Sequence, residues 1–97
     1  MLKEACVENF TNVPGVIERG AKRIELCDNL AVGGTTPSIG VIKIAAEYCS
    51  DKDVSIIVIL RPRGGDFVYS LMEKAIMMRD LEEIIASHAN GIAVGAL

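Results

Sequence analysis

Residues 54–60 read Val-Ser-Ile-Ile-Val-Ile-Leu, and this stretch decides the fold. It is almost continuously apolar and rich in β-branched side chains, which is typical of a parallel strand covered on both faces. Parallel neighbours cannot be joined by tight turns and need crossovers, which are usually helices. The flanking segments should therefore contain helices.

Helical signals lie on both sides of this strand. Before it, residues 37–49 carry an apolar stripe of helical spacing, with Thr36 as the predicted cap and Pro37 in the first helical position. After it, Ser70 and Glu73 have the spacing of a capping box, which predicts a helix that begins there and ends near His88.

The remaining elements extend the same alternation. Further strands are predicted at residues 2–8, 23–27 and 92–96, and a short helix is predicted that is capped by Thr11 or Asn12 and ends at Gly20. The order β-α-β-α-β-α-β leaves two architectures, a flavodoxin-like open sheet or a barrel. A full (β/α)8 barrel takes about 250 residues. The 97 residues here therefore predict an α/β fold that is the N-terminal half of a TIM-barrel-like (β/α) barrel, in one truncated domain.

Composition excludes several classes of function. The net charge is −3 and the basic residues are scattered, so nucleic-acid binding is not indicated. No apolar run is long enough to span a bilayer, and no secretory signal is visible at the N-terminus. The three widely spaced cysteines do not resemble a disulfide framework. We therefore expect a cytoplasmic protein with free thiols.

Polar side chains follow one face of the first two predicted strands. Alternation places Glu4, Cys6 and Glu8 on one face of the first strand, and Glu25 and Cys27 on one face of the second. Adjacent strands lie about 4.8 Å apart, so the two thiols can approach each other. Thiolates suit Cu(I) or Zn(II), and because two cysteines supply only half of a tetrahedral zinc site, Cu(I) is the better prediction. The alternative is a network in which acidic and basic groups neutralise one another.

Two further residues that could bind metal have simpler interpretations. Cys49 lies on the apolar stripe of its helix and is predicted to pack in the core. His88, predicted in the last turn of its helix, would complement the helix dipole.

Two glycine-containing loops are candidates for binding a small anion. In a parallel sheet, ligands bind beyond the carboxyl ends of the strands, where both loops should lie. Paired glycines allow close backbone approach, and arginines can hold a carboxylate or phosphate. The candidate residues are Arg61, Arg63, Gly64, Gly65 and Asp66 in one loop, and Gly33, Gly34 and Thr35 in the other. Neither loop matches a nucleotide-binding motif, and both could be ordinary tight corners.

Two long stretches resemble a known family. Residues 23–40 (RIELCDNLAVGGTTPSIG) and 61–70 (RPRGGDFVYS) closely resemble the signature segments of the CutC family, and residues 4–8 (EACVE) are similar to its first strand. The resemblance covers the whole chain. It implies a cytoplasmic TIM-barrel protein linked to copper handling, with the proposed Cu(I) ligands falling on Cys6 and Cys27.

Three functions remain open at this point. The first, which we favour over an enzyme, is a copper homeostasis protein that binds Cu(I) through cysteine thiolates. The second is an enzyme that acts on a small anionic substrate, with Glu25 or Glu8 as general base. The third is a truncated chain that is inactive alone. The exposed strand edges of a half barrel also predict self-association or pairing with a missing C-terminal half.

Overall fold

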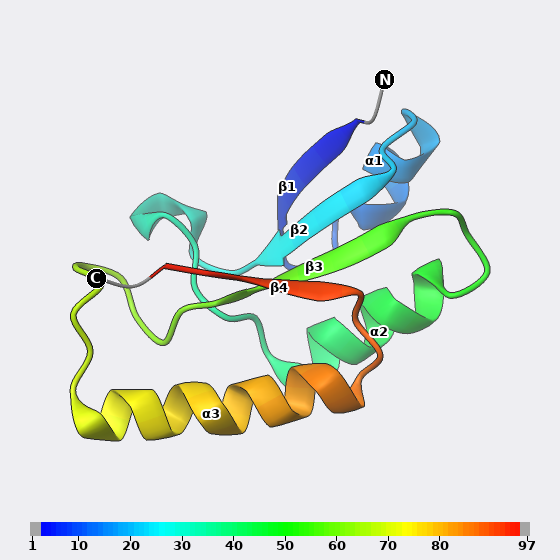
Figure 1. Cartoon of the computed structure of the whole chain (residues 1–97). Coiled ribbons are helices and arrows are strands. Elements are labelled where there is room, and N and C mark those ends of the chain that lie inside the picture. Colours follow the sequence, from blue (N-terminus) through cyan, green and yellow to red (C-terminus); the bar gives the residue numbers. More distant parts are fainter. Residues whose placement is uncertain (1–2, 96–97) are drawn as a thin grey trace.

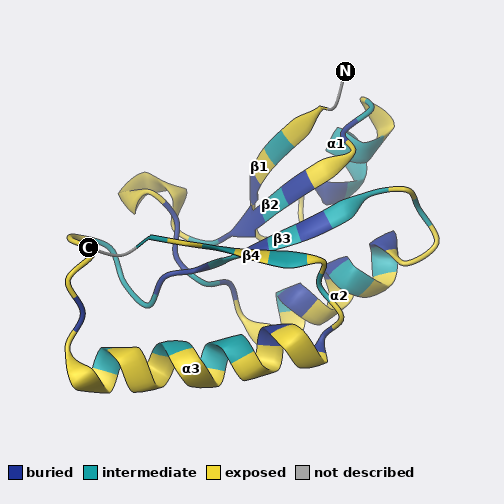
Figure 2. Cartoon of the chain, in the orientation of Figure 1, coloured by how far each residue is buried: buried dark blue, intermediate teal, exposed yellow. Residues whose placement is uncertain are grey.

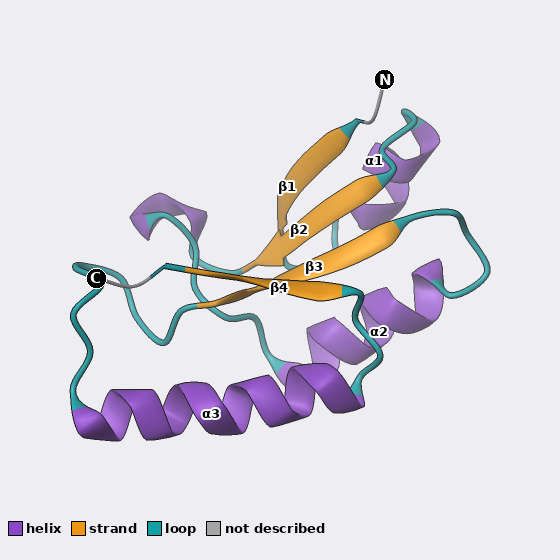
Figure 3. Ribbon diagram, in the orientation of Figure 1, coloured by secondary structure: helices purple, strands orange, loops and turns teal. Residues whose placement is uncertain are grey.

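Four parallel strands alternate with helices in the computed structural model, which describes residues 3–95 (Figure 1, Figure 3). In chain order the elements are β1 (Glu4–Glu8), α1 (Val13–Glu18), β2 (Arg23–Cys27), the short 3-10 helix η1 (Leu30–Val32), α2 (Ile39–Cys49), β3 (Ser55–Leu60), α3 (Leu71–Ala86) and β4 (Gly91–Val94). The predicted order is confirmed. The predicted first and fourth strands included Leu2 and Ala96, which lie outside the described residues.

The sheet has the strand order of a barrel. The strands lie in the order β1-β2-β3-β4, and every neighbouring pair is parallel. A flavodoxin-like sheet has the order 2-1-3-4-5 and helices on both faces. Here the helices lie on one side of the sheet, where they share one apolar core, and the other side is left uncovered (Figure 1). Of the two architectures open from the sequence, the structure shows the first half of a barrel.

The core lies between the sheet and the helices. Ile24 and Leu26 of β2 and Val58 of β3 are inaccessible to solvent, and they pack against a cluster that includes Ile42 and Cys49 of α2 (Figure 2). The prediction that Cys49 packs in the core is confirmed. Cutting back one of these large side chains should cost about 2–5 kcal/mol of stability.

The opposite face of β3 is only half-buried. Along this strand Ile56, Val58 and Leu60 are buried, whereas Ile57 and Ile59 are intermediate. The apolar run therefore predicted the strand correctly, but in this half barrel only its helix-facing side is fully covered. Its second side belongs to the face that would be the interior of a closed barrel.

Helix α2 begins at a different cap from the predicted one. Ser38 is the N-cap, and its hydroxyl accepts the Val41 N–H at 3.2 Å. Thr36 instead bonds the end of β3, because its hydroxyl accepts the Arg61 N–H at 2.9 Å and donates to the Arg61 carbonyl at 3.2 Å. Pro37 consequently precedes the helix and is not its first residue. Both Thr and Ser are good caps, so the spacing alone did not separate them.

Helix α3 begins as predicted and ends earlier. The capping box of Ser70 and Glu73 is present in full. The last helical residue is Ala86, and Ser87 closes the helix by donating to the Glu83 carbonyl at 2.6 Å. His88 has a φ of 64°, so it lies beyond the helix and the prediction of a dipole-complementing last turn is wrong. Among residues 3–95, the model has no helix with the length and apolarity needed to cross a bilayer.

Candidate functional site

A pair of thiols lies on the uncovered face of the sheet. The register pairs Cys6 with Glu25 and Glu8 with Cys27, so the two cysteines are diagonal neighbours on one face of adjacent strands. Their sulfur atoms are 3.6 Å apart. The structure thus brings together the two residues that alternation placed on facing positions.

The two thiols have different surroundings. Cys27 is 1% exposed, and its Sγ donates to the Val7 carbonyl at 3.3 Å, whereas Cys6 is exposed. Gly34 packs directly on Cys27: a Cβ at Gly34 would lie 3.4 Å from Cys27 Cβ and 3.2 Å from the side chain of Ile59. Cys27 is therefore fixed by its buried surroundings, whereas Cys6 can be reached from solvent.

Burial raises the pKa of the Cys27 thiol from 9.0 to about 12. The adjacent Cys6 thiol adds to this shift, followed by the negative charges of Glu25 and Glu8. Cys27 is therefore protonated near neutral pH. A metal that binds its sulfur must displace this proton, so binding will depend on pH.

The carboxylates near the thiols have separate roles. Glu8 accepts the Leu30 N–H at 2.7 Å, and Glu4 pairs with Arg23 at 2.6 Å. Within residues 3–95, the carboxylate of Glu25 has no side-chain partner. Glu25 lines a cavity of about 510 Å³ together with Cys6, Arg23 and Ile57.

The described part of the chain contains no group of three or more His, Cys, Asp or Glu residues suited to a metal ion, so the only candidate metal ligands at this site in residues 3–95 are the two thiols.

Arg61 lies at the carboxyl end of β3 and holds two loops together. Its Nη1 donates to the carbonyls of Val32 and Gly34 at 2.7 and 3.0 Å, and its Nη2 donates to the Gly65 carbonyl at 2.8 Å. Arg61 is 6% exposed, and the Phe67 ring lies over its guanidinium at 4.9 Å. It contributes to a second cavity of about 230 Å³, which Glu25 also lines.

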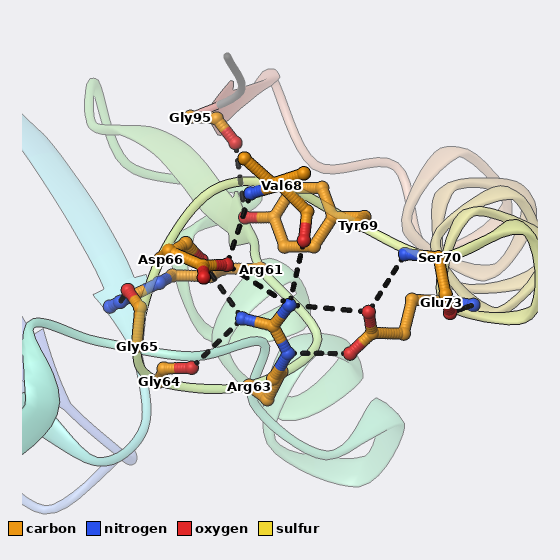
Figure 4. A network of polar contacts seen from close by, with 10 residues as sticks. All are labelled: Arg61, Arg63, Gly64, Gly65, Asp66, Val68, Tyr69, Ser70, Glu73 and Gly95. Atoms are coloured by element: carbon orange, nitrogen blue, oxygen red, sulfur yellow. Dashed lines mark hydrogen bonds and ion pairs between the residues drawn. The ribbon is translucent and has the colours of Figure 1, made fainter.

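Arg63 is occupied by a separate network, shown in Figure 4. It forms an ion pair with Glu73 at the start of α3 and another with Asp66, and it also donates to the carbonyls of Gly64, Asp66 and Val68. Its guanidinium lies over the Tyr69 ring at 5.2 Å. Arg61 and Arg63 therefore have different partners and do not converge on one point.

The glycine loop after β2 is folded on itself. The N–H groups of Gly33 and Gly34 donate to the carbonyls of Leu30 and Asn29, and Thr35 forms an isolated bridge with Asp28. Both glycines have a positive φ, at 93° and 96°. The carbonyls of Val32 and Gly34 accept hydrogen bonds from Arg61, so in this loop the backbone binds a cation.

For Phe67 and Tyr69, in the loop after β3, the sequence leaves open whether they line a pocket or cover the barrel rim, and the structure places Phe67 at a cavity. Phe67 covers Arg61, and the Tyr69 hydroxyl donates to the Gly95 carbonyl at 3.1 Å, which ties the loop after β3 to the end of β4. The only sequence signal is an aromatic residue next to an arginine-rich turn, and this does not specify which arginine it covers.

The comparisons with known proteins agree with this geometry. The model of the CutC family matches residues 1–97. The chain belongs to the CutC family. A CutC family protein of Enterococcus faecalis is 54% identical over 97 residues, which cover 100% of this chain and 46% of that protein. The human relative, named copper homeostasis protein cutC homolog, is 40% identical over 96 residues, or 99% of this chain and 34% of its own.

A solved CutC structure has the same fold. The crystal structure of CutC from Streptococcus agalactiae aligns with a TM-score of 0.94 at 45% identity, covering 100% of this chain and 46% of that one. The present CutC chain thus spans less than half the length of these relatives, as a half barrel should.

Proposed function

We propose that this CutC chain binds Cu(I) as cargo through the thiolates of Cys6 and Cys27, in the cytoplasm. The observation that carries the proposal is the 3.6 Å separation of the two sulfur atoms. Metal–thiolate bonds of about 2.3 Å, the length found at zinc, can bridge sulfurs at this distance. The family membership supports the metal, since the human relative is named for copper homeostasis.

Ligand chemistry favours Cu(I) over other cations at this pair. Thiolates are soft ligands that suit Cu(I), whereas a structural zinc site needs four ligands. Cys6 is exposed and Cys27 is buried, so the ion can arrive at Cys6 and then be held by both. Binding through both thiolates releases the proton of each thiol, and the negative charges of the two sulfurs offset the charge of the cation.

Copper titration of matched variants tests this proposal. The chain, Cys6→Ala, Cys27→Ala and Cys49→Ala are titrated anaerobically with Cu(I) against a competing chelator, after circular dichroism shows that each is folded. Cys49 is buried in the core on α2, so its variant loses a thiol outside the pair. We expect tight binding by the chain and by Cys49→Ala, and its loss in the other two. Equal binding by all four proteins would contradict the proposal.

A second function, catalysis on a small anionic substrate, is favoured by the position of Glu25. Its carboxylate lines both the cavity beside Cys6 and the cavity beside Arg61. A carboxylate without a side-chain partner in residues 3–95 is available as a general base. Replacement by Gln should then abolish turnover while preserving substrate binding, and unchanged turnover would exclude this role.

A further inference from the structure

Arg61 is a buried cation without a counter-ion in the described chain. An arginine guanidinium carries a positive charge in proteins, and Arg61 as a whole residue is 6% exposed. The ion pairs of residues 3–95 involve Arg23, Lys52 and Arg63, and none involves Arg61. Burying a charge without an opposite charge is costly, whereas a bound anion would remove most of that cost.

The donors of Arg61 are only partly used. A guanidinium has five N–H donors. Three of them bond the carbonyls of Val32, Gly34 and Gly65, and two remain. These are Nε–H and one N–H of Nη2. Within residues 3–95, Nε is the single buried side-chain nitrogen or oxygen without a hydrogen-bond partner. Nε and Nη2 together form the side of the guanidinium that binds an oxyanion with two parallel hydrogen bonds.

The position of Arg61 is that of a ligand-binding residue. It lies at the carboxyl end of β3, the end at which parallel β/α folds bind ligands. Gly33 packs closely on the guanidinium, since a Cβ at this position would lie 2.9 Å from Arg61 Nη1. Gly95 makes room for the ring of Phe67, since a Cβ would lie 3.2 Å from it. The Phe67 ring, which is 38% exposed, covers the guanidinium and would turn outward to admit a ligand.

We propose that Arg61 anchors a site for a small oxyanion, a carboxylate or phosphate held by Nε and Nη2 beneath Phe67. Glu25 lines the same cavity and would repel a purely anionic ligand. The favoured ligand therefore carries a hydroxyl or amine that donates to Glu25 at the end opposite its oxyanion. The cavity of about 230 Å³ limits it to a small molecule. This inference rests on the second proposed function, catalysis on a small anionic substrate, and specifies the class of that substrate. The site does not involve Cys6 or Cys27.

Proton–nitrogen NMR of the Arg61 Nε–H group tests the site directly. The folded chain is titrated with inorganic phosphate, with acetate and with glycolate, which adds a hydroxyl to acetate. We expect a saturable shift of the Arg61 Nε–H signal, with glycolate binding more tightly than acetate because of Glu25. The phosphate and carboxylate arms identify which oxyanion the site prefers. An Arg61 Nε–H signal that stays in place with all three anions would overturn the proposal.

Variants separate this site from general electrostatic attraction. Arg61→Lys keeps the charge but loses the two parallel donors, and should weaken binding about tenfold. Arg79→Gln removes an exposed arginine charge on α3 that does not line this cavity, and should leave binding unchanged. Equal weakening in both variants would overturn the proposal. The titration of the unmodified chain decides the matter if Arg61→Lys does not fold.

One variant can distinguish failure of the copper proposal from failure of the anion proposal. A Cys6→Ala/Cys27→Ala chain should lose Cu(I) binding and keep the Nε–H response to the preferred anion. Loss of the anion response in this folded variant would contradict a site built on Arg61 without the thiols.

Discussion

Cys6 and Cys27 lie with their sulfur atoms 3.6 Å apart although they are not register partners. The parallel register places Cys6 opposite Glu25 and Cys27 opposite Glu8, so each thiol has the other on the diagonal and a carboxylate directly alongside. The metal-binding proposal therefore concerns a thiol pair in a negative environment, and the following predictions depend on that environment.

The affinity for Cu(I) should rise with pH. The pKa of Cys27 is raised to about 12, so near neutral pH its thiol must release a proton when copper binds. Each proton released on binding makes the affinity rise about tenfold for each pH unit below the pKa of its thiol. Chelator competition at several pH values, corrected for the protonation of the chelator, measures this slope. An affinity that does not change with pH would contradict Cys27 as a ligand.

The chain should lose stability in alkaline solution because of Cys27. Its folded pKa of about 12 lies above the ordinary value of 9.0, so the fold favours the neutral thiol. This contribution is complete below pH 9 and is lost as the pH rises toward 12, by up to about 1.4 kcal/mol for each pH unit. Urea unfolding across this range should show a shallower loss in Cys27→Ala. Parallel curves for the two proteins would show that another group is responsible.

Gly34→Ala should damage copper binding as well as stability. Its φ of 96° strains any other residue, and its Cβ would press on Cys27 and Ile59. Gly20→Ala is the matched control, because Gly20 also has a φ of 96° but faces only the side chain of Lys3. Both variants should lose roughly 1 kcal/mol or more in urea unfolding. Only Gly34→Ala should also bind Cu(I) more weakly, and equal affinities would rule out this support of Cys27.

Helix caps provide a prediction for stability alone. Ser38→Ala removes the bond to the Val41 N–H and should cost about 1 kcal/mol in urea unfolding. Its copper affinity should match that of the unmodified chain, since Ser38 contacts neither thiol. A reduced affinity would mean that the start of α2 controls the thiol pair.

The fold was predictable because its signals are local. The apolar run of β3, the capping box at Ser70 and the spacing of strands and helices specified four strands and three helices, and residue count separated a half barrel from a complete one. The helix-facing and uncovered sides of each strand followed from alternation, which is also why Cys6 and Cys27 could be placed on one face. The cap of α2 could not be predicted, because the Thr36 hydroxyl instead accepts a hydrogen bond from Arg61 at the end of β3.

The partners of Arg61 and Arg63 could not be predicted from the sequence. Arg61 bonds carbonyls of Val32 and Gly34, which lie 29 and 27 residues away in the chain, and backbone carbonyls leave no residue-specific signal. The spacing of Ser70 and Glu73 predicts a capping box, whereas the second partner of Glu73, Arg63, reaches it only when the loop after β3 is folded. Burial of one arginine and neutralisation of the other are therefore properties of the tertiary structure.

X-ray absorption spectroscopy of the Cu(I)-loaded chain tests the central claim most directly, because it identifies the atoms bound to copper. The account predicts sulfur neighbours in the unmodified chain and in Cys49→Ala, with fewer sulfur neighbours in Cys27→Ala. A spectrum dominated by oxygen or nitrogen neighbours, or one that Cys27→Ala leaves unchanged, would contradict a copper site built on Cys6 and Cys27.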